Sequence, residues 1–168
     1  DGDTIFINTS STALLIIKYI IGKRVTVITN NGKAIFTDHG PNVQIVLTGG
    51  ELRIPKTSMV GDFALNNLNK VKANKSFLGC SGFDVKVGMS TAILQEVSIN
   101  EIMISRCAGE VFILADATKI NYVHQFIVAD PSNFNYLITD TRCTDEQIDQ
   151  FTEKGIKTKR LSPIYIYK

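Results

Sequence analysis

Short apolar runs alternate with longer helical stretches along most of the chain. The apolar runs are rich in β-branched residues and end in turn-forming residues, which is the pattern of strands that open into loops. They cover residues 5–7, 24–29, 43–47, 75–78, 110–116 and 136–140, and a last strand is expected from Ile156 onward. Alternation of strands and helices predicts an α/β domain, a Rossmann-like fold with a mainly parallel sheet and flanking helices.

Helices are predicted in the intervals between these strands. Residues 13–21 are apolar almost all round, which is typical of a helix packed beneath other elements, and residues 58–71 carry one apolar stripe. A short helix is predicted over residues 33–39, and residues 91–107 have the length and spacing of a further helix. Thr144 and Gln147 have the spacing of a capping box, so a further helix should begin there and end at Gly155.

Polar clusters follow five of the predicted strands, at residues 8–12, 29–32, 48–50, 79–84 and 116–119. Ligands of open parallel sheets bind outside the carboxyl ends of the strands. The clusters should therefore converge on one edge of the sheet.

The first cluster contains four consecutive hydroxyl residues, Thr9 to Thr12, between a strand and a helix. Unpaired N–H groups at a helix start favour an anion. The same hydroxyl groups could instead cap the helix, and that interpretation needs no ligand. The residues alone leave both interpretations open.

Composition limits the class of protein. With 168 residues, 44% hydrophobic and 20% charged, the chain fits a single globular domain over residues 1–168. A net charge of +2 gives no argument for a nucleic-acid surface on this segment. The three cysteines lack a Cys-x-x-Cys spacing, which indicates neither a disulfide framework nor a zinc site and fits a cytoplasmic location. Lys18 interrupts the longest apolar stretch, so no membrane span is expected.

Several of these segments together resemble a known family. They are Asp1-Gly2-Asp3-Thr4-Ile5, the loop 8–12, Thr29-Asn30, Thr48-Gly49-Gly50, residues 77–82 and Asp116-Ala117-Thr118-Lys119. In order and spacing they resemble the C-terminal sensor domain of DeoR-type bacterial transcriptional regulators, over essentially the whole chain.

The resemblance implies a fold similar to ribose-5-phosphate isomerases and CoA transferases. It also implies a phosphorylated sugar as effector, a dimer or tetramer, and no cofactor, metal or catalytic residue. DNA would be bound only by an N-terminal winged helix-turn-helix domain missing from this chain. The expected function is to regulate genes of sugar metabolism, as a repressor.

The family's first loop is Asp-Ser-Gly-Thr-Thr, and this chain departs from it at two positions. Asn8 replaces the aspartate, and an amide can donate as well as accept hydrogen bonds. Ser10 replaces the glycine, and a residue with a β-carbon would restrict the loop if it needs a positive φ. Both departures bear on which effector binds, and on whether one binds.

The resemblance implies roles for the residues of the five clusters. Thr9 to Thr12 would hold the phosphate, helped by Lys119, whereas Asp116 would orient that lysine or bind a hydroxyl; alternatively the pair is an ordinary surface ion pair. Asp84 would accept from sugar hydroxyls or simply close its own turn. The full set of expected effector-binding residues is Asn8, Thr9, Ser10, Ser11, Thr12, Thr29, Asn30, Gly49, Gly50, Gly79, Ser81, Gly82, Asp84, Asp116 and Lys119.

Two other functions remain open. A sugar-phosphate isomerase would need a carboxylate base. Asp84 is one candidate, but the second aspartate that those enzymes carry in the same loop is absent from the sequence near it. Glu96 is the other candidate, and its alternative is an ordinary solvated charge on a helix. The third possibility is a domain that only oligomerises. Cys80 is expected to be a buried inert thiol, and His39 and His124 are expected not to bind ligands.

Overall fold

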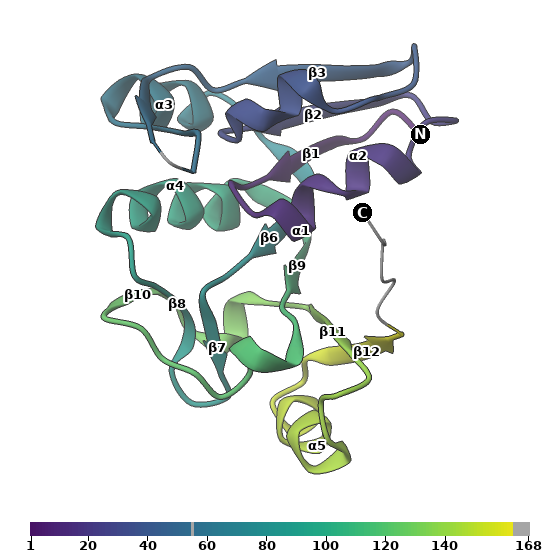
Figure 1. The fold of residues 1–168 in the computed structure, drawn as a ribbon, viewed down its shortest axis with the longest axis vertical. Helices are drawn as coiled ribbons and strands as arrows, with labels where there is room; N and C mark the ends of the chain where they lie inside the picture. The colour runs from purple at the N-terminus through teal and green to yellow at the C-terminus, as the bar shows by residue number, and fades with distance from the viewer. Residues whose placement is uncertain (55, 163–168) are drawn as a thin grey trace.

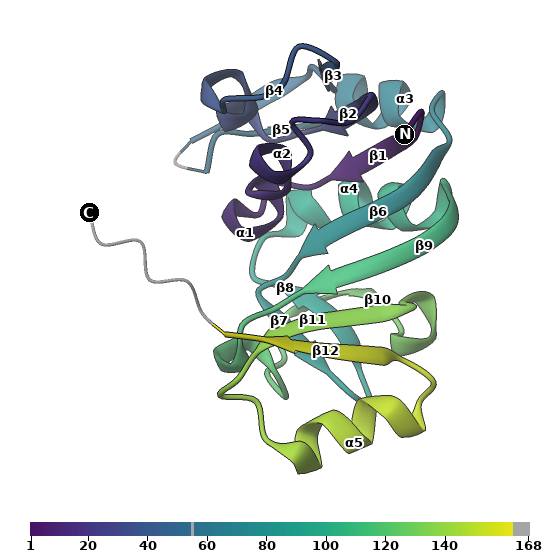
Figure 2. The same ribbon diagram turned by 90° about the vertical axis from the view of Figure 1, so that its right-hand side faces the viewer.

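The computed structural model describes residues 1–54 and 56–162. Its centre is a seven-stranded sheet with the strand order β12-β11-β9-β6-β1-β2-β3, and every neighbouring pair is parallel. The strands are β1 (Thr4–Ile7), β2 (Val25–Thr29), β3 (Val43–Leu47), β6 (Ala73–Gly79), β9 (Cys107–Leu114), β11 (Tyr136–Asp140) and β12 (Lys157–Leu161). Figure 2 shows them stacked along the long axis of the molecule. The predicted α/β fold with a parallel sheet is confirmed.

Helices cover both faces of this sheet (Figure 1). Helices α1 (Ser11–Leu14) and α2 (Ile16–Tyr19) pack on one face, and α3 (Asp62–Asn69) and α4 (Leu94–Ser105) pack on the other. Helix α5 (Asp145–Glu153) contributes Phe151 to the same core as α3 and α4. The described part of the chain also contains three short 3-10 helices: η1 (Gly32–Phe36), η2 (Ala117–Lys119) and η3 (Pro131–Asn133).

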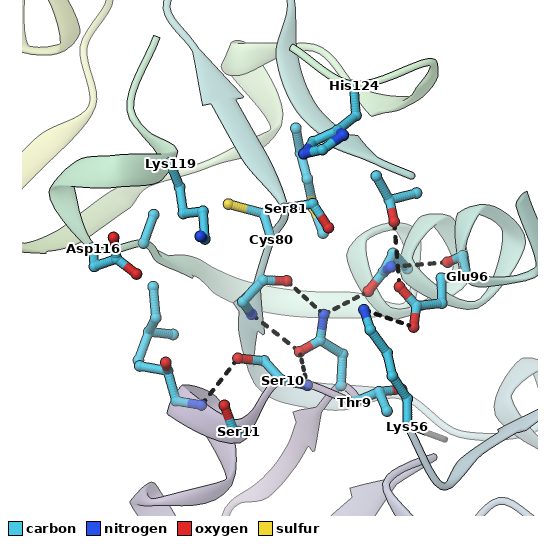
Figure 3. A pocket seen from close by; sticks show the side chains of 18 of the residues that line it. Thr9, Ser10, Ser11, Lys56, Cys80, Ser81, Glu96, Asp116, Lys119 and His124 are labelled. Carbon is cyan, nitrogen blue, oxygen red and sulfur yellow. Dashed lines mark hydrogen bonds and ion pairs between the residues drawn. The ribbon is translucent and has the colours of Figure 1, made fainter. Parts of the chain in front are cut away.

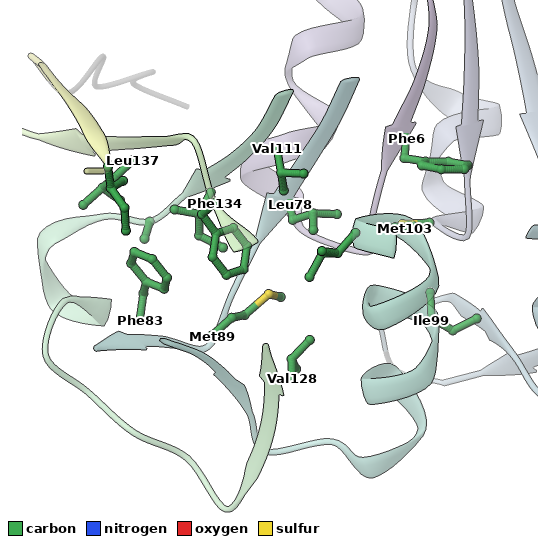
Figure 4. Packing of buried hydrophobic residues seen from close by; sticks show 14 of the residues in the cluster. Phe6, Leu78, Phe83, Met89, Ile99, Met103, Val111, Val128, Phe134 and Leu137 are labelled. Carbon is green, nitrogen blue, oxygen red and sulfur yellow. The ribbon is translucent and has the colours of Figure 1, made fainter. Parts of the chain in front are cut away.

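The alternation of side chains along β1 explains why two cores form. Ile5 and Ile7 point to the face covered by Ala13 and Ile17 of the first two helices, whereas Phe6 points to the opposite core. This opposite core is larger, and Figure 4 shows Phe6, Ile99 and Met103 at one end of it and Phe83 and Phe134 at the other. Because both faces are buried, β1 is apolar from Ile5 to Ile7 rather than alternating between apolar and polar residues, as is typical of strands in parallel sheets.

Two small antiparallel sheets were not predicted. Strands β4 (Glu51–Arg53) and β5 (Ser58–Val60) form a hairpin, and β7 (Gly82–Asp84), β8 (Gly88–Thr91) and β10 (Phe126–Ala129) form a three-stranded sheet. The helix predicted over residues 58–71 is therefore wrong in its first turn. Gly61, with φ of 84°, ends β5 and turns the chain into α3, which begins at Asp62.

Other boundaries also differ from the prediction. The helix expected over residues 13–21 begins earlier, at Ser11, and is broken at Leu15 into two short helices. The helix expected over 91–107 is α4, which starts at Leu94 because Thr91 still belongs to β8. The capping box of Thr144 and Gln147 is confirmed. Within the expected last strand, residues 163–168 lie outside the described part of the chain.

The strand order reverses direction between β1 and β6. From β1 the chain first adds β2 and β3 on one side, and then crosses over to add β6, β9, β11 and β12 on the other. The connections on the two sides leave the sheet in opposite directions, so a crevice opens where they part, at the carboxyl ends of these two strands. In the described part of the chain, no helix is long and apolar enough to cross a membrane.

Candidate functional site

A cavity of about 580 Å³ occupies this crevice, at the carboxyl ends of β1, β6 and β9 (Figure 3). Cavities of this size commonly hold small molecules. The residues of the predicted effector site that line it are Asn8, Thr9, Ser10, Ser11, Thr12, Gly79, Ser81, Asp116 and Lys119. The expected convergence is therefore observed for the loops after β1, β6 and β9, which are the first, fourth and fifth of the predicted strands.

Asn8 joins three elements at the base of the cavity. Its side-chain amide donates to the backbone oxygen of Gly79 and to Oδ1 of Asn100, both at 2.8 Å. Its Oδ1 accepts from the backbone N–H groups of Gly79, at 3.0 Å, and Ser10, at 3.3 Å. Asn8 is 5% exposed, and its amide thus fixes the position of the first loop relative to β6 and α4.

Ser10 is the N-cap of α1. Its Oγ accepts from the backbone N–H groups of Thr12 and Ala13, both at 3.2 Å. Its φ is −68°, so the expected restriction from replacing a glycine does not arise. Of the two interpretations of the hydroxyl cluster, capping holds for Ser10, whereas the hydroxyl groups of Thr9, Ser11 and Thr12 take no part in this cap.

Gly79 lies directly against Ser10. A β-carbon at Gly79 would overlap the Cβ and Oγ atoms of Ser10. The last residue of β6 must therefore be a glycine for the serine to reach its capping position, because no other residue leaves that space empty.

The loop after β9 carries Asp116 and Lys119. Asp116 caps η2 by accepting from the N–H of Thr118 at 2.9 Å, and Lys119 Nζ donates to Thr118 Oγ1 at 3.2 Å. The expected orientation of the lysine by the aspartate is thus indirect, through Thr118. Cys80 lies beside them (Figure 3), and its burial raises the pKa of the thiol to about 12. The sequence predicts a buried inert thiol; Cys80 is half-buried at the cavity wall, and the raised pKa keeps its thiol neutral at physiological pH.

Asp140, at the end of β11, stabilises this loop by a hydrogen bond to its backbone. Its carboxylate accepts from Arg142 Nη2 at 2.7 Å and from the backbone N–H of Ala117 at 3.1 Å. The hydrogen bonds from Arg142 hold the pKa of Asp140 well below its usual range. Arg142 also lies 4.0 Å from Asp116, so charges outside the cavity support the turn that presents Lys119.

Comparison with known families identifies the chain. Residues 1–141 match the family model described as DeoR C terminal sensor domain. The chain belongs to this family. The match spans the cavity residues from Asn8 to Lys119, and it confirms the resemblance that the sequence segments indicated.

Relatives of this sensor domain are transcriptional regulators. The uncharacterized HTH-type transcriptional regulator YulB of Bacillus subtilis (strain 168) is 31% identical over 157 residues, which are 93% of this chain and 60% of that protein. The lactose phosphotransferase system repressor of Lactococcus lactis subsp. lactis is 26% identical over 161 residues, 91% of this chain and 61% of the repressor. The sensor domain thus spans about 60% of the length of these relatives.

Among solved structures, the sensor domain is similar to the ribose 5-phosphate isomerase from Plasmodium falciparum. The identity is 13% and the TM-score 0.46, over 70% of this chain and 45% of that one. A likeness this distant carries no functional argument.

Six residues of the expected site lie outside the cavity lining of the sensor domain: Thr29, Asn30, Gly49, Gly50, Gly82 and Asp84. The loops after β2 and β3 instead hold the β4–β5 hairpin and α3. Asn30 donates to the backbone oxygen of Met59, at 3.2 Å, and Gly50 packs against Val60 and Ala64. Asp84 closes its own turn by accepting from the N–H groups of Lys86 and Val87, which is the alternative given above for this residue.

The sequence missed polar residues that complete the lining: Lys33, Lys56, Thr91, Glu96, Asn100 and His124. Glu96 was considered only as a possible base or a solvated charge, but it is 8% exposed and faces the cavity from α4. His124 lines the cavity, and the expectation that it binds no ligand stays a prediction. In residues 1–54 and 56–162, no three His, Cys, Asp or Glu residues are grouped to hold a metal ion.

Proposed function

We propose that this DeoR-family sensor domain binds a phosphorylated sugar in the cavity at the carboxyl ends of β1 and β6. The observation that carries the proposal is that the ammonium of Lys119 and the hydroxyl groups of Thr9, Ser11 and Thr12 line one cavity. A lysine ammonium binds phosphate as a point charge, and hydroxyl groups donate to its oxygens. The name of the lactose phosphotransferase system repressor, one of the relatives, agrees with an effector from sugar metabolism.

We further propose that the sensor domain belongs to a longer cytoplasmic repressor in which a winged helix-turn-helix domain binds DNA. The effector would bind the DNA-competent and DNA-incompetent states of a dimer or tetramer unequally, because only a difference in affinity shifts such an equilibrium. Support comes from the relatives, which are transcriptional regulators of greater length than this chain.

An isomerase activity has less support. Asp84, the first candidate base, closes its own turn outside the cavity. Among the described residues, the two acidic ones that line the cavity are Glu96 and Asp116, and they lie on opposite sides of it. Asp116 accepts from the N–H of Thr118, so the described cavity lining lacks the pair of aspartates in one loop that the isomerases use. We therefore propose a binding function without turnover.

A thermal-shift screen of the chain against sugar phosphates and their unphosphorylated counterparts tests the proposal. A ligand at a hundredfold excess over its Kd stabilises the folded state by about 2.7 kcal/mol. We expect a rise in Tm with a phosphorylated sugar, and a smaller rise for Lys119→Ala and Ser11→Ala.

Lys72→Ala, an exposed lysine away from the cavity, is the matched control and should respond like the unsubstituted chain. If no sugar phosphate raises the Tm, the domain does not sense this class of compound, and the oligomerisation-only alternative gains support.

A further inference from the structure

A carboxylate, a hydroxyl and an ammonium meet on the side of the cavity away from Asp116 and Lys119 (Figure 3). Glu96 Oε1 lies 3.5 Å from Nζ of Lys56, which sits between β4 and β5. Thr91 Oγ1, at the end of β8, donates to Glu96 Oε2 at 3.3 Å. The Glu96 side chain is 10% exposed, whereas that of Lys56 is 45% exposed.

The partners of Glu96 leave about half of its hydrogen-bonding capacity unused. An ionised carboxylate offers about four lone-pair sites and only accepts hydrogen bonds. Among the described residues, Glu96 has two side-chain partners, and both distances are longer than the usual 2.7 to 3.0 Å or so. Because a buried charge is costly when it is poorly paired, further donors at this position would be bound favourably. The hydroxyl groups of a sugar are such donors.

Hydrogen bonds fix both the backbone of Glu96 and the hydroxyl group that donates to its carboxylate. Asn100, one helical turn along α4, donates to the backbone oxygen of Glu96 at 2.8 Å and accepts from Asn8. Thr91 Oγ1 accepts from the N–H of Ile93 at 3.2 Å, which leaves its hydroxyl hydrogen for Glu96. The loop of residues 8–12 is thus linked to the backbone of Glu96 through two side-chain amides, Asn8 and Asn100. A site fixed in this way can discriminate between ligands by geometry.

We propose that Glu96, with Thr91 and Lys56, recognises the hydroxyl groups of the ligand, and that this end of the cavity determines which phosphorylated sugar binds. The proposal rests on the function proposed above, because it assigns the second end of the same cavity. Glu96 accepts from ligand hydroxyls, and the ammonium of Lys56 donates to a ligand oxygen. The phosphate is recognised separately, by Lys119 and the loop after β1.

Titrations followed by backbone amide NMR signals test this assignment. The probes are inorganic phosphate, a panel of pentose and hexose phosphates, and the corresponding unphosphorylated sugars. We expect Glu96→Gln and Thr91→Val to weaken the sugar phosphate that binds the unsubstituted chain by about tenfold or more, and to change the affinity for inorganic phosphate by less than about twofold. Thr91→Ser, which keeps the hydroxyl, should restore binding. Glu101→Gln, an exposed glutamate on the same helix, is the matched control.

The outcomes separate this inference from the proposed function. If Glu96→Gln and Thr91→Val, both folded by their NMR spectra, leave the affinity for every bound sugar phosphate unchanged, the inference is wrong and the sugar-phosphate function stands. If an unphosphorylated sugar binds as tightly as its phosphate and Glu96→Gln abolishes that binding, the hydroxyl end is supported and the phosphate function is wrong. Absence of binding by all probes overturns both.

Discussion

The side-chain amide of Asn8 pairs with both backbone polar groups of Gly79. Its Nδ2 donates to the Gly79 oxygen at 2.8 Å, and its Oδ1 accepts from the Gly79 N–H at 3.0 Å. The amide therefore takes the place of the backbone pairing that is lost where β1 and β6 end. Only a side chain that both donates and accepts can do this, so an aspartate at this position could not make the same contacts.

Asn8→Asp should destabilise the domain. The carboxylate would lose two donor hydrogen bonds and face the Gly79 oxygen and Asn100 Oδ1 without a hydrogen atom between them. We expect a loss of about 3 kcal/mol in the free energy of unfolding at neutral pH, measured by urea denaturation. Asn42→Asp, at an exposed position, should change the stability by less than about 0.5 kcal/mol. Equal stability of the two variants would contradict the role given to Asn8.

Gly79→Ala should be destabilising, and Ser10→Gly should suppress its effect. The new methyl group would overlap the Ser10 side chain, at a cost of about 1 to 3 kcal/mol. Ser10→Gly alone loses the cap and should cost only a few tenths of a kcal/mol or so. A double-mutant cycle in urea should therefore give a large coupling. Additive effects would show that the overlap is relieved elsewhere. Gly22→Ala, where no atom lies within 4 Å of the new group, is the control.

The sequence predicted those parts of the fold that depend on local pattern. The apolar residues of β1 and β2 alternate between the two cores, those of β3 face one core, and turn-forming residues follow each of these strands. Convergence of the loops after β1, β6 and β9 follows from a general property of parallel sheets. For these reasons the sequence alone predicts that the loop of residues 8–12 and Lys119 lie at the same edge of the sheet.

The missed residues depend on contacts between distant segments. Lys56 reaches the cavity because Asn30 pairs with Met59, and nothing local to the β4–β5 hairpin indicates that contact. Helix α4 is apolar over much of its surface, so its pattern could not show which way Glu96 points. Strands β7, β8 and β10 are short, and β10 pairs with β8 from a distant part of the chain, so their residues carry no strand signal strong enough to predict them.

Asp140→Asn should reduce stability in a pH-dependent way. The folded-state pKa of Asp140 lies below its unfolded value, so its contribution is fully present above about pH 4 and is lost as the pH falls toward the folded-state value. We expect the variant to be less stable by about 2 kcal/mol at pH 7, with the difference shrinking below about pH 4. Urea denaturation at several pH values measures this. Asp38→Asn, at an exposed position, should show no such trend, and a constant difference for Asp140→Asn would contradict the role of its charge.

Cys80 should react slowly with thiol reagents although it lines the cavity. The thiolate is the reactive form, and burial raises the pKa of Cys80 to about 12, so little thiolate exists at pH 7.5. In a Cys107→Ser, Cys143→Ser background, iodoacetamide should modify native Cys80 at least about a hundredfold more slowly than it modifies the same chain in urea, where the thiol has an ordinary pKa near 8.5. The rate should rise with pH without levelling off below about pH 10. A plateau near pH 8 would mean that the folded protein exposes this thiol to water, and the cavity wall beside Lys119 would then be more open than the structure indicates.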